Sequence, residues 1–461
     1  ELHSSYSLEE KKKGFSSSIG SSGFSIGYGK TESKLKEKDL TNAKSNLVLG
    51  DNVTLNKGAE ITATNFTHGK VTVNNGDVKF GARKDTRDVE TSTNSSGLNL
   101  SVKIKSEALD RAKQGIDSFK QMKSGDILGG IASTTNTVTG VVSGLASNQG
   151  TKLPTSAVNA DNTVGKDNLK AAQATNNFYA DAGVNFGYTK SSSKTNSHNE
   201  SAVVTTIKGK DENSSITYNN VKNIEYIGTQ AQDTKFIYNN VENINKTAVE
   251  LNNSYSSTGK SSGISTGVTI GYGDGVQTEA NGVSISASKS KMNTNGTNFQ
   301  NGRFINVDEV HNNTKNMTLS GFNQEGGKVT GNIENLTIES KQNTSTIKGR
   351  TVGGSLSIAP NGMPSGSANY SQTNGERRVV DNASTFIIGD GSNLKVGKVE
   401  NTAAAIGTSG NGKLSIDEYV GHNLENVDKL KTAGGSVGVS TSGITSIGVN
   451  YSDKKQKGIT R

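Results

Sequence analysis

Short stretches in which apolar and polar residues alternate dominate the N-terminal part of the chain. The clearest are residues 47–49, 53–55, 71–73 and 78–80, which are separated by turns rich in Gly, Asn and Asp. Alternation with a period of two is typical of strands with one buried face, and closely spaced turn signals keep such strands short. The pattern therefore predicts an all-β architecture built from short strands.

A seven-residue segment occurs twice at a fixed offset. Residues 218–224 read Tyr-Asn-Asn-Val-Lys-Asn-Ile and residues 238–244 read Tyr-Asn-Asn-Val-Glu-Asn-Ile, an offset of 20 residues. Residues 316–319 and 335–338 form a looser pair, 19 residues apart. Periods near 20 with one aliphatic cluster each predict the turns of a parallel β-helix, in which equivalent residues of successive turns stack about 4.8 Å apart. Identical asparagines at equivalent corners then form ladders of side-chain amides, and the ladder candidates are Asn219, Asn220, Asn239 and Asn240.

A second, longer repeat is rich in glycine. Residues 14–29 and 260–273 both lead into the sequence Ile-Gly-Tyr-Gly, and weaker copies lie at 182–188, 353–358 and 434–439. Glycine at alternate positions removes the side chains from one face of a strand and lets another backbone approach closely. These segments are either β-hairpin arms that leave the coil or Gly-rich turns within it, and the sequence leaves both alternatives open.

One region departs from the β pattern. Apolar residues from position 106 to 146 follow a helical period, which predicts a helical hairpin inserted between two β-helical parts, followed by a polar linker. The alternative is a pair of membrane-active helices, whose apolar face includes Leu109, Ile116, Phe119, Leu128, Ile131 and Val142. The expected division of the chain is thus residues 1–105 as β-helical turns with a Gly-rich arm, 106–180 as helical insertion and linker, and 181–461 as further turns and arms.

Composition separates an ordered coil from a disordered chain. Of 461 residues only 30% are hydrophobic, 55 are Gly and 3 are Pro, and the net charge is +8. An ordinary globular core needs more apolar residues, while a disordered chain of low hydrophobicity usually carries a larger charge imbalance and more Pro. A thin solenoid satisfies both limits, and about 280 residues in turns of ~20 would give ~14 turns. The chain contains no Cys, and it begins mid-pattern without a signal peptide, as expected of an internal part of an exported protein.

The residue types needed for catalysis or metal binding are scattered. The five histidines lie far apart and none has metal-ligand spacing. Asp308-Glu309 and Asp417-Glu418 are adjacent pairs, so on a strand their side chains point to opposite faces and neither pair forms a glycan-cleaving dyad by itself. The sequence predicts neither enzyme activity nor a cofactor. The lysine clusters at 11–13 and 454–457 lack interleaved aromatics, which argues against nucleic-acid binding and favours edge-strand protection.

Taken together, the Gly-Phe-Ser segments leading into Ile-Gly-Tyr-Gly, the Asp-Val-Glu-Thr-Ser sequence at 88–92 and the small-residue insert resemble haemagglutinin repeats. These occur in filamentous haemagglutinin-like exoproteins of the two-partner secretion pathway. The resemblance implies a right-handed parallel β-helix, here with Gly-rich β-hairpin arms and a small helical insertion. It also implies an outer-membrane transporter as a partner and a secreted or cell-surface location associated with virulence.

Two functional hypotheses follow from that resemblance. In the first, the chain is the monomeric rod-like shaft of an adhesin, which contacts a receptor on a host or neighbouring cell. In the second, it is the stalk or translocation region of a contact-dependent growth inhibition toxin-delivery protein, and the helical insert makes a transient membrane contact. Basic charge (sequence pI ≈ 9.2) also favours weak attraction to negatively charged surfaces.

Overall fold

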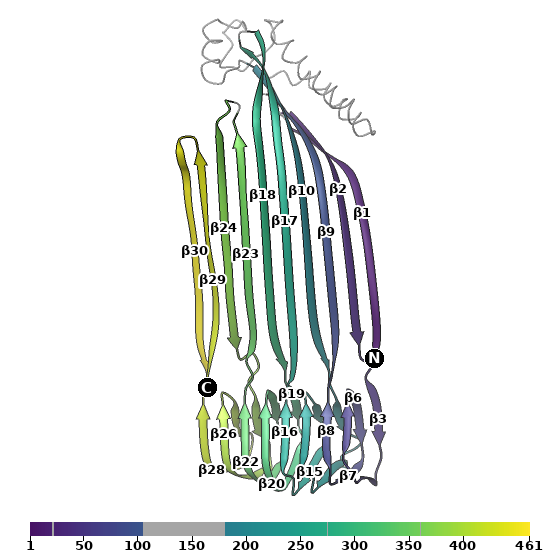
Figure 1. Cartoon of the computed structure of the whole chain (residues 1–461). Helices are drawn as coiled ribbons and strands as arrows, with labels where there is room; N and C mark the ends of the chain where they lie inside the picture. The colour runs from purple at the N-terminus through teal and green to yellow at the C-terminus, as the bar shows by residue number, and fades with distance from the viewer. Residues whose placement is uncertain (21–22, 105–179, 274, 360) are drawn as a thin grey trace, which may run out of the picture.

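The computed structural model describes residues 1–20, 23–104, 180–273, 275–359 and 361–461, and every regular element in these ranges is a β-strand. The strands form two bodies (Figure 1). Short strands wind into a parallel coil, and long strands form one antiparallel sheet that stands on the side of this coil. The parallel coil is the β-helix that the 20-residue repeat predicts.

Each turn of the β-helix contributes a strand to an eight-stranded parallel sheet, so the described residues make eight turns. The strands of this first face, in chain order, are β3 (Ser45–Leu49), β6 (Thr64–His68), β11 (Thr206–Gly209), β14 (Gln230–Gln232), β19 (Gly302–Ile305), β21 (Phe322–Glu325), β25 (Thr385–Ile388) and β27 (Ala405–Thr408).

The other two faces belong to a twelve-stranded sheet. The second face of the first four turns holds β4 (Val53–Leu55), β7 (Lys70–Asn74), β12 (Ser215–Asn219) and β15 (Lys235–Asn239), and the third face holds β5 (Ala59–Thr62), β8 (Asp77–Gly81), β13 (Asn223–Ile227) and β16 (Asn243–Thr247). In the last four turns one longer strand covers both faces: β20 (Asp308–Ser320), β22 (Val329–Glu339), β26 (Asn393–Thr402) and β28 (Lys413–His422). The register follows the sequence repeat, because Tyr218 pairs with Tyr238 and Ile224 with Ile244.

The interior of the β-helix is a continuous apolar core. Alternate residues of each strand point inward, and Phe236, Phe304, Phe322 and Phe386 are fully buried there. Phe304 lies edge-on to Phe322 of the next turn, with ring centroids 5.0 Å apart. Stacked turns therefore enclose a narrow core even though few residues of the chain are apolar.

The long strands form five antiparallel hairpins joined side by side into a ten-stranded sheet, here called the arm sheet. Its strands are β1 (Leu2–Gly20), β2 (Gly23–Thr41), β9 (Arg83–Ile104), β10 (Ala180–Val203), β17 (Val249–Gly273), β18 (Gly275–Gln300), β23 (Asn343–Ile358), β24 (Pro364–Val379), β29 (Leu424–Ser440) and β30 (Gly443–Thr460). All the Gly-rich repeats lie in these strands. They are arms and not turns of the coil.

Turns and arms alternate in a fixed order along the described chain. Two turns follow each of the first four hairpins, and the fifth hairpin follows the eighth turn. Two turns advance the coil by about 9.6 Å, and the two strands of one hairpin occupy the same width, because both bodies share a strand spacing near 4.8 Å. The arm sheet and the coil therefore grow in step. The described residues make eight turns where the sequence analysis expects ~14, because the arms take up a large part of the described chain.

The two lysine clusters lie on the outer strands of the arm sheet. Lys11, Lys12 and Lys13 belong to β1 at one edge, and the cluster at 454–457 belongs to β30 at the other. Lysines on an exposed edge disfavour pairing with a further strand, because a second strand would have to approach their charges.

The predicted helical insertion and linker fall on residues 106–180, almost all of which lie outside the described part of the chain, as do the six residues of its apolar face, Leu109, Ile116, Phe119, Leu128, Ile131 and Val142. A search of the described residues finds no helix of the length and apolarity needed to span a bilayer.

Candidate functional site

The two faces of the arm sheet carry different side chains. Residues directly opposite each other in an antiparallel sheet point to the same face, and successive residues point to opposite faces. The register across all ten strands thus assigns every side chain to a face. In the half of the sheet away from the coil, one face holds mostly Gly, Ser, Thr and Asn, as in the aligned row Gly29, Gly97, Thr189, Gly263 and Ser286. This is called the small-residue face.

Hydroxyl groups on the small-residue face bond to one another across strands. Ser95 and Ser191 are hydrogen-bonded, as are Ser261 and Ser288. Ser355 Oγ lies 2.6 Å from Ser367 Oγ. This face therefore carries few charges, and several of its hydroxyl groups are hydrogen-bonded to one another.

The opposite face carries large apolar residues toward the hairpin tips. Their exposed fractions range from 36% for Val283 to 79% for Val449. The members, here called the tip band, are Ile264, Val268, Val283, Ile285, Leu356, Ile358, Val437, Val439, Ile444, Ile447 and Val449. The apolar residues lie near the tip of each hairpin, whatever its length. The strands β29 and β30 end closer to the coil than β17 and β18 (Figure 1), and their apolar residues also lie closer to the coil.

Basic side chains lie next to the tip band on the same face. Lys190, Lys260, Lys289, Lys291 and Arg350, here called the basic belt, are exposed and line one shallow depression that crosses β10, β17, β18 and β23. The Arg350 guanidinium lies over the Tyr370 ring, 5.4 Å from its centroid. Within the described residues none of these five cations is within 4 Å of a carboxylate. The belt therefore presents unneutralised positive charge beside an apolar surface.

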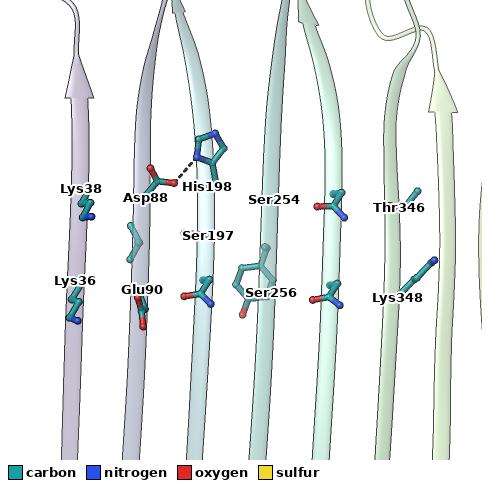
Figure 2. A pocket seen from close by; sticks show the side chains of 15 residues that line it. Lys36, Lys38, Asp88, Glu90, Ser197, His198, Ser254, Ser256, Thr346 and Lys348 are labelled. Atoms are coloured by element: carbon teal, nitrogen blue, oxygen red, sulfur yellow. Dashed lines mark hydrogen bonds and ion pairs between the residues drawn. The ribbon is translucent and has the colours of Figure 1, made fainter. Parts of the chain in front are cut away.

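Closer to the coil, the same face forms a second depression that holds both charge signs. Figure 2 shows His198 of β10 beside Asp88 of β9, with Lys36 on the adjacent β2 and Lys348 farther away on β23. His198 Nδ1 lies 2.6 Å from Asp88 Oδ1 and its Nε2 lies 3.1 Å from Glu200 Oε1. These hydrogen bonds, first that to Asp88, raise the pKa of His198 above its ordinary value. Because both ring nitrogens bind carboxylates, the imidazole is a cation held between two anions and has no nitrogen left to activate a nucleophile.

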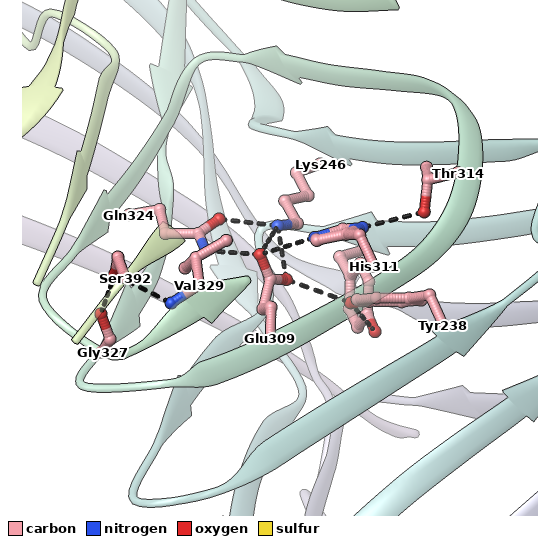
Figure 3. A network of polar contacts seen from close by, with 10 residues as sticks. Tyr238, Lys246, Glu309, His311, Thr314, Gln324, Gly327, Val329 and Ser392 are labelled. Carbon is pink, nitrogen blue, oxygen red and sulfur yellow. Dashed lines mark hydrogen bonds and ion pairs between the residues drawn. The ribbon is translucent and has the colours of Figure 1, made fainter. Parts of the chain in front are cut away.

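A third cluster of polar residues lies inside the β-helix (Figure 3). Lys246 of β16 donates to both oxygens of Glu309 in β20, at 2.8 and 3.1 Å, and to Gln324 Oε1 in β21 at 2.6 Å. Gln324 Nε2 in turn donates to Glu309 Oε1 at 2.6 Å. His311 Nε2 lies 3.5 Å from the same oxygen. The cluster therefore connects three successive turns of the coil.

Tyrosine hydroxyls extend this cluster toward earlier turns. Tyr238 donates to Glu309 Oε2 at 3.2 Å, and Tyr226 lies 3.0 Å from both Tyr238 and Tyr218. The ionisable groups are completely buried. Burial by itself would raise the pKa of Glu309, but Lys246 and His311 outweigh it and hold that pKa well below its usual range. Burial lowers the pKa of His311, so its ring stays neutral at pH 7.

Enclosure decides what the buried cluster can do. No described residue of the cluster reaches solvent, and no group of three or more potential metal ligands occurs in the described chain. A substrate or ion has no route to Glu309, so the cluster acts on packing: it satisfies buried polar groups across turns. Asp308, its neighbour, points outward and accepts the Lys328 N–H at 2.8 Å. The opposite orientation of these two carboxylates is the one that strand alternation predicts.

The ladder candidates lie at two corners of adjacent turns. Asn239 Nδ2 donates to Asn219 Oδ1 at 2.9 Å, and the chain of amides continues to Asn74 on one side and Asn312 on the other, at 3.0 and 2.8 Å. Asn220 and Asn240 follow with positive φ values of 53° and 52°. Asn tolerates this left-handed conformation better than most residues, so these two turn the chain while their neighbours form the ladder. Asn240 also accepts from Asn313 Nδ2 at 3.1 Å.

The sequence interpretation missed the buried Lys246. A signal for it exists, because the 20-residue register aligns Lys246 with Tyr226, an inward position. The tip band and the basic belt were also missed, although their residues stand at alternate positions of the Gly-rich repeats. Assigning them to one face required the pairing of strands that are distant in the sequence, such as β10 with β17 and β24 with β29.

Comparison with known proteins identifies the central part of this architecture. Residues 186–354, which run from β10 to β23, match the family described as the Hemagglutinin repeat. No curated protein and no solved structure matches the chain. The matched residues contain the Gly-rich segment at 260–273, one of the features on which the sequence resemblance depends, and four turns of the coil. Residues 186–354 are therefore similar to the haemagglutinin repeats of filamentous haemagglutinin-like proteins.

Proposed function

We propose that this chain is a structural shaft of a secreted bacterial surface adhesin, and that the arm sheet is its contact surface. One observation supports this most strongly. The arm sheet exposes an apolar band and a basic belt on one face, while its other face carries mostly Gly, Ser, Thr and Asn. Large exposed apolar patches on soluble proteins usually mark interaction sites.

The β-helix has a different part in this proposal. Its core is closed, so it holds the arms in a fixed plane and sets their spacing. A right-handed coil is expected, because crossovers between parallel strands almost always have that hand. Export through an outer-membrane transporter and display at the cell surface fit a family whose members are secreted or surface-associated.

A shortened-arm variant tests the proposal. Tyr255 pairs directly with Thr294, so residues 256–293 can be replaced by a two-residue turn that leaves the base of this hairpin and both flanking turns of the coil in place. Beads that carry the full chain should adhere to cells, and beads that carry the variant should lose most of this adhesion. Unfolding monitored by circular dichroism controls for the coil. Equal adhesion by a folded variant would contradict the proposal.

The alternative proposal is that the same shaft is the stalk or translocation region of a contact-dependent growth inhibition toxin-delivery protein. The shortened arm distinguishes the two. If the chain is an adhesin shaft, the purified chain adheres to cells by itself and loses this adhesion when the arm is shortened. If it is a toxin-delivery stalk, inhibition of neighbouring cells requires a toxic domain in addition to the shaft.

A further inference from the structure

The face that carries the tip band has more exposed apolar surface than a soluble sheet normally leaves uncovered. The largest apolar patch on a typical monomer is about 300–600 Å² and is often functional. Here eleven large apolar side chains, each at least 36% exposed, lie on one face in two groups, one on β17, β18 and β23 and one on β29 and β30, with Gly366 and Ala368 of β24 between them. A surface of this kind requires a partner that is itself apolar over a broad, flat area.

Charge on the same face narrows the choice of partner. In the three register rows that contain Lys190, Lys260 and Lys291, this face has ten basic and two acidic residues, a difference of 10 − 2 = +8. The basic residues are Lys11, Lys13, Lys30, Lys34, Lys190, Lys194, Lys260, Lys289, Lys291 and Arg350, and the acidic ones are Glu9 and Glu32. The two rows between them point to the small-residue face and contain only Lys12 and Glu10, a difference of zero. Within these five rows the excess positive charge is confined to the apolar face.

The spacing between band and belt matches a lipid surface. Ile285 and Lys289 lie four residues apart on β18, which corresponds to about 14 Å along the strand. Elements that bind at an interface bury their apolar side about 5–10 Å into the boundary between headgroups and acyl chains. Insertion of the part of the band on β17, β18 and β23 to that depth places the belt near the lipid phosphates, together with Ile447 and Val449, which share register rows with the belt. Lysine and arginine side chains are long enough to reach the phosphates.

A second copy of the chain is a poorer match to this face. Two copies packed face to face with tips in the same direction would bring the two basic belts together. If the tips of the two copies pointed in opposite directions, the two tip bands would pack together, but neither basic belt would face acidic groups of the other copy. An anionic bilayer offers acyl chains to the band and phosphates to the belt at once.

We infer that the tip band and the basic belt of the arm sheet bind the surface of a bilayer that contains anionic phospholipid. This inference rests on the proposed function of the arm sheet as the contact surface, and it names the partner. The small-residue face stays in water. Binding is interfacial: the tip band enters one leaflet, and the positive charges of the basic belt hold the sheet against it.

Vesicle flotation with the full chain tests the inference. Vesicles of phosphatidylcholine alone are compared with vesicles in which a quarter of the lipid is phosphatidylglycerol. The chain should bind the second kind at least tenfold more tightly, and the preference should fall as salt shortens the Debye length. Each lysine near an anionic surface contributes about 1 kcal/mol, or about fivefold in affinity. The double substitution Lys289→Gln/Lys291→Gln should therefore reduce binding by about 25-fold.

The matched control uses the same strand. Ser288 and Ser290 flank Lys289 and point to the small-residue face, so Ser288→Glu/Ser290→Glu makes the same change in net charge on the other side of the sheet. This control should bind anionic vesicles within about twofold of the parent, apart from the weak long-range effect of net charge. Ile285→Ser with Leu356→Ser should weaken binding to both kinds of vesicle, because it removes apolar contact and leaves the charge unchanged.

Three results would overturn the inference. One is equal loss of binding in the lysine and serine variants, since net charge alone would then explain it. Another is absence of vesicle binding by a chain whose coated beads still adhere to cells, which leaves the proposed function standing but with a different partner. The third is a concentration-dependent dimer in sedimentation that Leu356→Ser abolishes, together with no vesicle binding, which assigns the face to a second copy.

Discussion

The β-helix and the arm sheet consist of strands with the same spacing, yet they are stabilised in different ways. In the coil, Phe304 is completely buried and packs on aromatic rings of neighbouring turns. In the arms, Ile285 of β18 keeps 49% of its surface exposed, and none of the described elements forms a second layer over its part of the sheet. Regular backbone pairing holds the arms together once the coil has aligned their bases. A two-stranded hairpin alone is marginal in water, whereas ten tethered strands support one another laterally.

The largest expected effect comes from an unpaired charge in the coil. Glu309→Leu leaves Lys246 buried without its counter-ion, and breaking a buried pair from one side costs about 3–5 kcal/mol. We expect a loss near the top of that range in the free energy of unfolding, measured with urea. The double variant Lys246→Met/Glu309→Leu removes both charges and should recover most of the loss. Equal losses in the free energy of unfolding for the single and double variants would show that the ion pair itself stabilises the fold, and that the unpaired Lys246 charge is not the cause of the loss.

Removal of one large apolar side chain from each region measures the difference in burial directly. Phe304→Ala creates a cavity between turns and should cost about 3–4 kcal/mol, as large-to-small core substitutions do. Ile285→Ala removes a half-exposed side chain and should cost less than about 1 kcal/mol. Urea unfolding of the two variants provides the comparison. Similar losses would mean that the arm sheet is covered by another surface in solution.

The amide ladder contributes an intermediate amount to the coil. Asn239→Ala removes the hydrogen bonds to Asn219 and Asn312 at a half-buried corner. A loss of about 1–2 kcal/mol is expected, since a typical hydrogen bond contributes about 1 kcal/mol and the partner amides regain some water. Asn245→Ala on the neighbouring strand, away from this ladder, is the control. A loss no greater than that of the control would indicate that the ladder follows the fold and does not stabilise it.

The smallest effect is expected in the arms and depends on pH. Since Asp88 and Glu200 raise the pKa of His198, the protonated ring stabilises the fold fully at pH values below its unfolded pKa of about 6.5. This stabilisation disappears as the pH rises through the raised folded value. His198→Gln should therefore lower the melting temperature by a degree or two at pH 5.5 and leave it unchanged at pH 9. A shift of the same size at both pH values would contradict a role for the charged ring.

The sequence predicts the coil better than the arms, for a physical reason. Turns of a β-helix repeat because each residue contacts its equivalent about 20 positions away, so Tyr218 and Tyr238 record the fold in the local sequence. The arms have no enclosed core, and their alternating Gly and Ser fit either a hairpin or a turn of the coil. Pairing between Ser191 and Ser261, or between Arg350 and Lys291, is needed to see which side chains share a face. The sequence did not predict the buried Lys246–Glu309 ion pair, because lysine is normally a surface residue.

Two turns of coil for every hairpin make the molecule modular in length. A change that removes one turn, or one strand of an arm, shifts the coil and the sheet relative to each other by a strand width. A change that removes two turns with their hairpin keeps every remaining strand opposite a neighbour. Variation by recombination within such a chain is therefore expected to proceed in whole units of two turns and one arm. The tip band and the basic belt would then widen or narrow by two strands at a time.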